Sequence, residues 1–301
     1  MSCNVTANRE LTASSGQGVV DALVALLELE KLDENLYRGV SPQISPQRVF
    51  GGQVAGQALV AGGRTVASDR VVHSLHSYFI RSGDPTVPII YHVEPVRDGR
   101  SFSVRRVVAV QHGEPIFILS ASFQLEQGGI DHQSPMPDVP GPESLPTVTE
   151  RLIGFEELHA WYGRSPRAFD IRYVDDPPWV QRSLGPREHQ PHRVWLKADG
   201  VLPDDPLLHV CAVTFASDLN LLDSVLIHHG LASQLDPVGT ASLDHAMWFH
   251  RQFRADEWLL YESESPSASG GRGLATGRFF TRDGRHVASV VQEGMIRLPN
   301  A

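Results

Sequence analysis

Cysteine is scarce in this 301-residue chain, and the segments that mark secreted and membrane proteins are missing as well. Its two cysteines, Cys3 and Cys211, cannot build a disulfide framework or a CxxC site. No stretch approaches the ~18 apolar residues of a membrane helix. The N-terminus also lacks a basic flank followed by an apolar run. We therefore expect a reduced, cytoplasmic protein without a membrane span.

Positive charge is also in deficit, because the formal net charge is −9. A nucleic-acid-binding surface would need a basic excess, so we expect no nucleic-acid partner. The 14 histidines include no H-E-x-x-H pair, and the dipole of a helix end accounts for His228 and His229. We expect no metal and no cofactor. Neither a G-x-S-x-G elbow nor a P-loop is present, which leaves chemistry by an activated water.

What the chain does contain is a helix followed by a run of strands. Apolar residues at helical spacing over 19–29 and a glycine-rich segment over 51–63 predict two helices. Gly52 and Gly56 inside the second helix indicate that other backbone approaches it closely. A helix followed by consecutive strands is typical of α+β proteins rather than of alternating βαβ units. The four predicted strands are Val71–Ile80, Val87–Val96, Phe102–Val110 and Pro115–Leu125.

The second half repeats this order after a segment with five prolines and three glycines, residues 127–146. This composition predicts a linker between a first domain at 18–126 and a second at 147–301. In the second domain we expect a helix over Asp218–His229, closed by Gly230. The predicted strands are Phe169–Tyr173, Arg193–Lys197, Leu208–Phe215, Ala241–Phe249, Glu257–Ser263, Leu274–Thr281 and His286–Ile296.

Three aligned segments indicate that the halves arose by duplication. VFGGQ (49–53) aligns with TFASD (214–218), HSYFIR (76–81) with AMWFHR (246–251), and HGEPIFILSASFQ (112–124) with DGRHVASVVQEGM (283–295). The first pair would open the central helix of each half, and the last would lead into its final strand.

Polar residues distinguish the second half from the first. Asp218 aligns with Gln53 and Gln292 with Ala121, whereas Ser242 falls near Val72 across gaps. Buried polar groups destabilise a core unless they are satisfied, so this asymmetry indicates a site. Asp218 would equally suit the first turn of a helix, where the dipole stabilises a carboxylate.

The same motifs resemble those of the acyl-CoA thioesterase II family, the TesB-like enzymes. The similarity covers FGGQVAGQAL, HSLHSYFIRSGD, VRDGRSFSVRRV, FASDLNLL, SLDHAMWFHR, EWLLYESESPSASGGRG and VVQEG, between about residues 26 and 297. The resemblance implies a double hotdog, in which two curved antiparallel sheets each wrap a central helix. It also implies hydrolysis of fatty acyl-CoA by a catalytic Asp, Thr and Gln in the second hotdog. These correspond to Asp218, Ser242 and Gln292, with serine in place of the usual threonine. Losing the methyl group that restricts χ1 predicts a looser geometry at Ser242.

Substrate contacts follow less directly. The phosphates of CoA need cations, for which Arg97, Arg100, Arg105 and Arg106 are candidates, although a solvated strand face explains these arginines equally well. His73 and His76 resemble positions of the family's first domain and would line the site, unless they are satisfied core histidines.

Two other functions stay open at this stage. A hotdog enoyl-CoA hydratase would use a D-x-N-x-x-H-like pattern, which Asp218 and Asn220 begin but which has Asp at 223 instead of His. A non-catalytic acyl-CoA-binding protein is the second alternative. Two hotdogs in one chain would mimic the dimer of single-hotdog proteins, and we expect a homo-oligomer of this chain.

Overall fold

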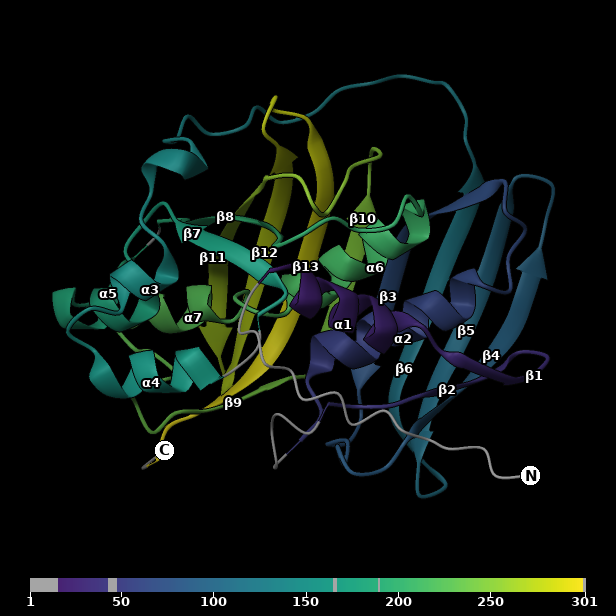
Figure 1. Cartoon of the computed structure of the whole chain (residues 1–301), viewed down its shortest axis with the longest axis horizontal. Helices are drawn as coiled ribbons and strands as arrows, with labels where there is room; N and C mark the ends of the chain where they lie inside the picture. The colour runs from purple at the N-terminus through teal and green to yellow at the C-terminus, as the bar shows by residue number, and fades with distance from the viewer. Residues whose placement is uncertain (1–15, 43–47, 165–166, 189, 300–301) are drawn as a thin grey trace.

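The computed structural model describes residues 16–42, 48–164, 167–188 and 190–299, and it places two sheet-and-helix units side by side (Figure 1). The first unit contains β1 (Glu30–Asp33), β2 (Leu36–Gly39), α2 (Gly51–Gly63), β3 (Arg70–Phe79), β4 (Ile89–Asp98), β5 (Phe102–Gln111) and β6 (Glu114–Leu125). The second contains β7 (Phe169–Tyr173), β8 (His192–Ala198), α6 (Pro206–Ser217), β10 (Asp244–Phe249), β11 (Leu259–Ser269), β12 (Arg272–Thr281) and β13 (His286–Arg297).

The strands form one antiparallel sheet whose order is the same when it is read inward from either end. The order is β1-β2-β4-β5-β6-β3-β10-β13-β12-β11-β8-β7, so β3 and β10 meet in the middle. At this junction Leu75 pairs with Met247, and both side chains are fully buried. This internal symmetry confirms the predicted α+β architecture built from two copies of one unit.

Short elements decorate this framework. The helix α1 (Gln17–Leu27) packs against α2 and α6, and β9 pairs with β13. The remaining elements are the 3-10 helix η1 (Pro142–Ser144), α3 (Val148–Arg151), α4 (Glu156–Arg164), α5 (Pro178–Leu184), α7 (Asp223–His228) and β9 (Gly239–Ser242).

The two central helices pack directly against each other in opposite directions, through the glycines of α2. A Cβ atom at Gly52 would lie 2.4 Å from the carbonyl oxygen of Phe215, and one at Gly56 would lie 3.2 Å from that of Cys211. At the other end of α2, Gly63 meets Leu207. Glycine is required where backbone approaches this closely. The predicted close approach is therefore confirmed, and the approaching backbone is that of α6.

The prediction for the second central helix was wrong. The segment Leu208–Phe215, expected as a strand, lies within α6, and Asp218 caps the C-terminal end of that helix instead of opening the next one. Only Asp223–His228 of the expected helix is helical, and Gly230 follows it with a positive φ of 68°. The alignment of VFGGQ with TFASD therefore paired the start of one helix with the end of the other.

Cys211 accordingly lies in α6, where it is fully buried, and not in a strand. Burial raises the pKa of its thiol well above the ordinary value, which keeps it protonated and unreactive. Its packing role agrees with the expectation, although the element that carries it does not.

The connection between the units contains no helix or strand from Glu126 to Gly141 and crosses one edge of the molecule (Figure 1). It is nevertheless attached, because the indole Nε1 of Trp195 donates a 2.9 Å hydrogen bond to the carbonyl of Pro140. Met136, Val139 and Leu145 pack near the same tryptophan. The connection therefore covers part of the outer face of the second sheet. The division at 126 and 147 stays a prediction.

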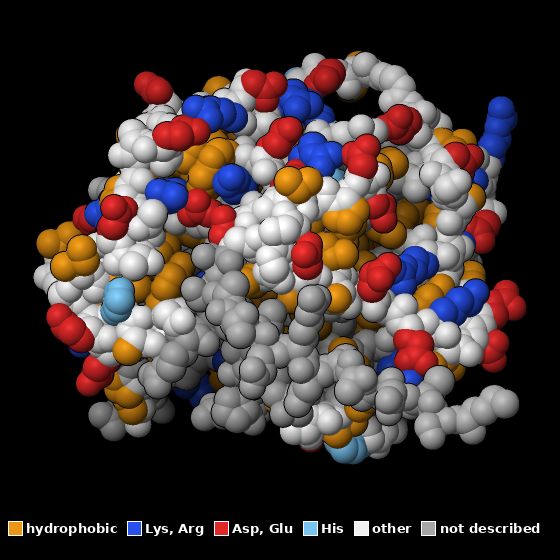
Figure 2. All heavy atoms as spheres, viewed as in Figure 1, with side chains coloured by type: hydrophobic (Ala, Val, Ile, Leu, Met, Phe, Trp, Pro, Cys, Tyr) orange, Lys and Arg blue, Asp and Glu red, His pale blue; other side chains and the backbone are white. Residues whose placement is uncertain are grey.

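The surface carries mixed charge on the face shown in Figure 2, where acidic and basic side chains are interspersed. In the described part of the chain, no helix is both long and apolar enough to cross a membrane.

Candidate active site

Asp218, Ser242 and Gln292 come together where α6 ends beside β9 and β13. Gln292 lies inside β13 and is 1% exposed, and Ser242 is the last residue of β9. The amide Nε2 of Gln292 donates to Asp218 Oδ1 at 3.0 Å and to Ser242 Oγ at 2.7 Å. The hydroxyl of Ser242 donates to the same Oδ1 at 3.3 Å. The three side chains predicted from sequence thus form one hydrogen-bonded cluster.

A histidine fixes the orientation of the Gln292 amide. His245 Nδ1 lies 2.6 Å from Gln292 Oε1, and since that oxygen only accepts, the ring hydrogen must be on Nδ1. The other ring nitrogen, Nε2, lies 2.9 Å from the hydroxyl of Ser217. His245 is 1% exposed, and burial lowers its pKa, which favours the neutral ring. Gln292 therefore presents its NH₂ group, and not its oxygen, to Asp218.

Asp218 is half-buried at the end of α6, and desolvation raises the pKa of its carboxyl group. Hydrogen bonds from Gln292, Ser242 and the backbone N–H of Gly52 act in the opposite direction, as does the nearby imidazole of His245. Burial dominates, so Asp218 is a stronger base than an exposed aspartate. Because α2 and α6 are antiparallel, the start of α2 supplies the Gly52 donor at the point where α6 ends.

The second carboxylate oxygen, Oδ2, lies close to the first residue of α2. A Cβ atom at Gly51 would lie 2.8 Å from Oδ2 and 2.8 Å from a ring carbon of Phe79. The position therefore requires glycine, because any side chain would clash with Oδ2 and Phe79, while Oδ1 is occupied by Ser242 and Gln292.

Comparisons with known proteins identify the family of this chain. The family model for the acyl-CoA thioesterase N-terminal domain matches residues 40–124, and the acyl-CoA thioesterase model matches residues 165–295. Mouse acyl-coenzyme A thioesterase 8 is 43% identical over 290 residues, which cover 92% of this chain and 89% of that protein. Acyl-CoA thioesterase 2 of Haemophilus influenzae is 38% identical, over 93% of this chain and 98% of that protein.

The chain belongs to the acyl-CoA thioesterase family. Among solved structures, the acyl-CoA thioesterase II TesB2 of Mycobacterium marinum has 47% identity and a TM-score of 0.76, over 92% of this chain and 98% of that one. A hot dog fold protein of Alicyclobacillus acidocaldarius, with 19% identity, has a TM-score of 0.73 over 92% of this chain and 98% of that one. The hotdog architecture implied by the sequence motifs is confirmed.

The cluster of Asp218, Ser242 and Gln292 does not include the two histidines singled out in the first unit. His73 Nε2 lies 2.8 Å from Ser122 Oγ, and its ring meets that of Phe102 edge-on, which describes a satisfied histidine between strands. His76 is exposed and packs edge-on against the ring of Trp248. Their role in substrate binding stays a prediction.

The four candidate arginines differ in their availability. Arg105 is 3% exposed and donates to Thr65 and to the carboxylate of Asp98, so its donors are already used within the protein. Arg106 pairs with Glu94 on the surface. Arg97 and Arg100 are exposed. A role in binding phosphate is a better prediction for these two than for Arg105.

Two members of the site were missed from sequence, the backbone N–H of Gly52 and the side chain of His245. The contact of Gly52 depends on how α2 and α6 pack, so no local pattern reveals it. His245 stands three residues after Ser242. Side chains alternate between the two faces of a strand, so His245 shares its face of β10 with the apolar Met247 and Phe249, and this pattern was the available signal that it points inward. No group of three or more His, Cys, Asp or Glu side chains in the described chain is arranged to hold a metal ion.

Proposed function

We propose that this protein hydrolyses fatty acyl-CoA to a free fatty acid and CoA, using a water activated by Asp218 and held by Ser242 and Gln292. One observation carries the proposal. The half-buried carboxyl group of Asp218 has a raised pKa, and its Oδ1 is fixed by the side-chain donors of Ser242 and Gln292. This arrangement suits a general base acting on a small nucleophile.

In the first step the water oxygen attacks the thioester carbonyl carbon while Asp218 accepts a proton from the water. The tetrahedral intermediate then collapses, the C–S bond breaks, and the proton held by Asp218 passes to the departing CoA sulfur. The products are a carboxylic acid and the CoA thiol, and Asp218 returns to its ionised form. Positioned proton transfer of this kind contributes roughly 10²–10⁴-fold to rate.

The developing oxyanion needs hydrogen-bond donors, and the start of α2 is the best candidate to supply them. The first-turn amides of any helix lack intrahelical acceptors. In α2 the preceding residue, Phe50, does not supply a side-chain acceptor for them either. Gly52 already donates to Asp218, which brings the adjacent amides to the same place. Oxyanion donors of this type contribute several kcal/mol, typically about 3 kcal/mol each.

Release of CoA from dodecanoyl-CoA by the purified chain tests the proposal, with the free thiol measured over time. We expect Asp218→Asn to reduce kcat at least a hundredfold, because asparagine cannot accept the proton. Circular dichroism should show that the variant keeps its fold. Near-normal turnover by the variant would exclude Asp218 as the base.

The alternatives predict different products. An enoyl-CoA hydratase would add water to a double bond and retain the thioester, so loss of the enoyl absorbance without thiol release would favour it. The structure does not favour the hydratase. Asp223 stands where a hydratase would have histidine, and its carboxyl group is buried beside Asn220. Tight binding of acyl-CoA without either reaction would identify a binding protein.

Two further properties stay predictions. We expect a cytoplasmic location, which fractionation of the source cells would check. We also expect a homo-oligomer, for which light scattering coupled to gel filtration should give a mass that is a multiple of 33.1 kDa.

A further inference from the structure

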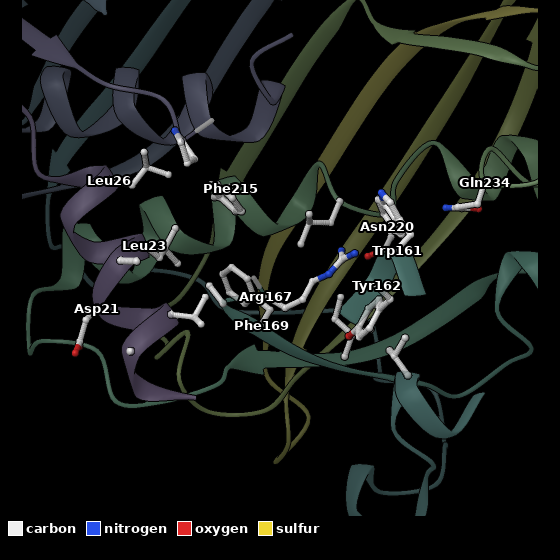
Figure 3. Close-up of a pocket in the computed structure, with 18 of the residues that line it drawn as sticks. Asp21, Leu23, Leu26, Trp161, Tyr162, Arg167, Phe169, Phe215, Asn220 and Gln234 are labelled. Carbon is white, nitrogen blue, oxygen red and sulfur yellow. The ribbon is translucent and has the colours of Figure 1, made fainter. Parts of the chain in front are cut away.

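The end of α6 has two sides, and only one of them borders a pocket. This pocket, of about 1020 Å³, lies between α1, α4 and β7, and Phe215 and Leu219 are among the residues that line it (Figure 3). Residues two positions apart on a helix do not share a face, so Ser217 points away from the side that carries Phe215. Ser217 is fully buried and lies outside the pocket wall. Any effect that its side chain has on catalysis must therefore pass through its neighbours.

On the buried side, the hydroxyl group of Ser217 has one hydrogen and more than one acceptor within reach. Its Oγ lies 2.9 Å from the carbonyl oxygen of Thr214, in the preceding turn of the helix, and 2.9 Å from Nε2 of His245. The sulfur of Met247, a weaker acceptor, lies 3.5 Å away. The acceptor that takes this one hydrogen decides what Nε2 meets.

The ring of His245 determines where the hydrogen goes. Nδ1 carries the ring hydrogen, because it meets the accepting oxygen of Gln292 at 2.6 Å. Burial lowers the pKa of the imidazole and keeps it neutral, so Nε2 is an acceptor. Within the described part of the chain, Ser217 is the one hydrogen-bond partner of Nε2. A buried acceptor without a donor is costly, so Ser217 donates to Nε2.

The opposite ring form would disturb the proposed base. With its hydrogen on Nε2, the ring would donate to Ser217, and the lone pair of Nδ1 would face the oxygen of Gln292. The Gln292 amide would then have to turn over, which would place its oxygen against the carboxylate of Asp218. The hydroxyl of Ser217 thus favours the ring form that keeps the NH₂ group of Gln292 on Asp218.

Ser217 is itself held by a tyrosine of the second sheet. The hydroxyl of Tyr261, on β11, donates a 3.1 Å hydrogen bond to the backbone carbonyl of Ser217. The Tyr261 ring is 1% exposed and stacks on that of Phe279, with 4.0 Å between the ring centres. These contacts fix the last residue of α6, immediately before Asp218.

We propose that Ser217 is a positioning residue, whose hydroxyl group keeps the ring hydrogen of His245 on Nδ1 and thereby orients the Gln292 amide toward Asp218. The hydrogen-bonded series then runs from Ser217 through His245 and Gln292 to the carboxylate. The inference rests on the proposed function, which it deepens by naming the group that supports the base from behind.

The position of the ring hydrogen can be measured without turnover. In the ¹⁵N spectrum of histidine-labelled wild-type protein at pH 7, we expect His245 to show a protonated Nδ1 and an unprotonated Nε2. The chain has 14 histidines, and the His245→Asn variant identifies the resonance by its loss. In Ser217→Ala we expect signals of both ring forms, because Nε2 has lost its donor. A wild-type spectrum with the hydrogen on Nε2 would overturn the proposal, whatever the variants do.

Steady-state kinetics give the second readout. Ser217→Ala should lower kcat about 3- to 10-fold, the effect of one lost hydrogen bond, with KM within about twofold because no substrate contact changes. Ser224→Ala is the matched control. Ser224 is also buried, and its hydroxyl donates to the carbonyl of Leu221, three residues back, at 2.7 Å. Both variants should lose some thermal stability, but Ser224→Ala should leave kcat within about twofold.

A double-mutant cycle separates the ring form from general packing. Asparagine at position 245 has no tautomer, so in the His245→Asn background Ser217→Ala should lower kcat less than twofold. An equal loss in both backgrounds would overturn the proposal, as would a Ser217→Ala spectrum that keeps the wild-type ring form. Absence of CoA release from the wild-type protein would instead reject the thioesterase function, and the spectra would still decide the role of Ser217.

Discussion

Gln292 shows how a single buried amide can organise the proposed reaction centre. Its NH₂ group has two hydrogens, which go to Asp218 and Ser242, and its oxygen accepts from His245. Every polar group of the side chain is therefore satisfied, as a buried amide requires. A rotation by 180° about the last bond would place oxygen against the carboxylate of Asp218, which repels it. The orientation of Gln292 thus depends on the proton that His245 carries on Nδ1.

His245 should consequently be a positioning residue. We expect His245→Ala to lower kcat about 10- to 100-fold with little change in KM, because the Gln292 amide loses the partner that orients it. His245→Asn places an N–H near the position of Nδ1 and should restore much of the loss. Steady-state kinetics on both variants would check this. Equal defects in both variants, accompanied by equal losses in thermal stability, would indicate a purely structural role.

Asp223 should make stability depend on pH. Burial raises its pKa to about 7, above the ordinary value near 4 that an unfolded chain would show. Its contribution is fully present below pH ~4 and is lost as the pH rises toward 7. We expect Asp223→Asn to become more stable than wild type as the pH rises, by up to about 4 kcal/mol at pH 8.

Urea unfolding of both proteins at pH 5, 6, 7 and 8 would measure this difference. Asp98 serves as the control, because hydrogen bonds from Ser103 and Arg105 lower its pKa, so that it is ionised in both the folded and the unfolded chain from pH 5 to 8 and the effect of its replacement should not change with pH over this range. A difference for Asp223→Asn that is constant with pH would show that its carboxyl group titrates normally.

At the level of elements, the contact between α2 and α6 joins packing to chemistry. The glycines of α2 allow its backbone to touch that of α6, and this contact brings the Gly52 amide to Asp218. The stability of the helix pair and the geometry of the base therefore depend on the same few atoms.

Substitutions along α2 should separate these effects. A methyl group at Gly52 would lie 2.4 Å from the Phe215 carbonyl oxygen, so Gly52→Ala should destabilise the fold by about 2 kcal/mol or more and reduce kcat. At Gly62 the nearest atom would be 3.4 Å away, on Val107. Gly62→Ala should therefore stabilise by up to about 1 kcal/mol through helix propensity, with unchanged kcat. Thermal unfolding and kinetics on both variants would check this, and a neutral Gly52→Ala would contradict the packing model.

Sequence patterns predicted most strands and α2 but misassigned α6, for a physical reason. The helix is buried nearly all round, so Leu208, Val213 and their neighbours show no polar face and look like a core strand. The missed signal was Asp205 followed by Pro206, because an N-cap aspartate and a proline in the first turn are typical of a helix start. With that boundary in place, Asp218 falls at the end of the helix.

The sequence predicted the candidate site mainly where a polar residue of the second half aligns with an apolar residue of the first. Gln292 occupies a position that is Ala121 in the first unit, and both side chains are buried, so the polar exchange was visible in sequence. Asp218 was found through a motif although its helix was misplaced. His245 and Gly52 join the site through packing between segments far apart in the chain. Only the folded structure brings them together.

On the scale of the whole molecule, the units are joined by non-covalent contacts as well as by the connection between them. The β3–β10 ladder and the α2–α6 contact hold them together independently of residues 127–146. Gly128 and Gly129 are exposed, with open space around both.

Cutting the connection should therefore leave the enzyme assembled. We expect a protease site inserted between Gly128 and Gly129 to give, after cleavage, two fragments that elute together and keep at least half of the activity. Gel filtration in native buffer followed by denaturing electrophoresis would check this, with uncleaved protein as the control. Separation of the fragments would show that the connection itself holds the units together.

The antiparallel helix pair has a consequence for the number of reaction centres. A dimer of identical single-hotdog chains has two equivalent places where one helix starts beside the end of the other. Here one of these places pairs Gly52 with Asp218, whereas the other pairs Gly63 with the apolar Leu207. If Asp218 is the base, as proposed, one chain thus carries one reaction centre per pair of hotdogs. Active-site titration should accordingly count one equivalent per polypeptide, and each unit is free to evolve a separate task, the first as donor of backbone amides and the second as carrier of the base.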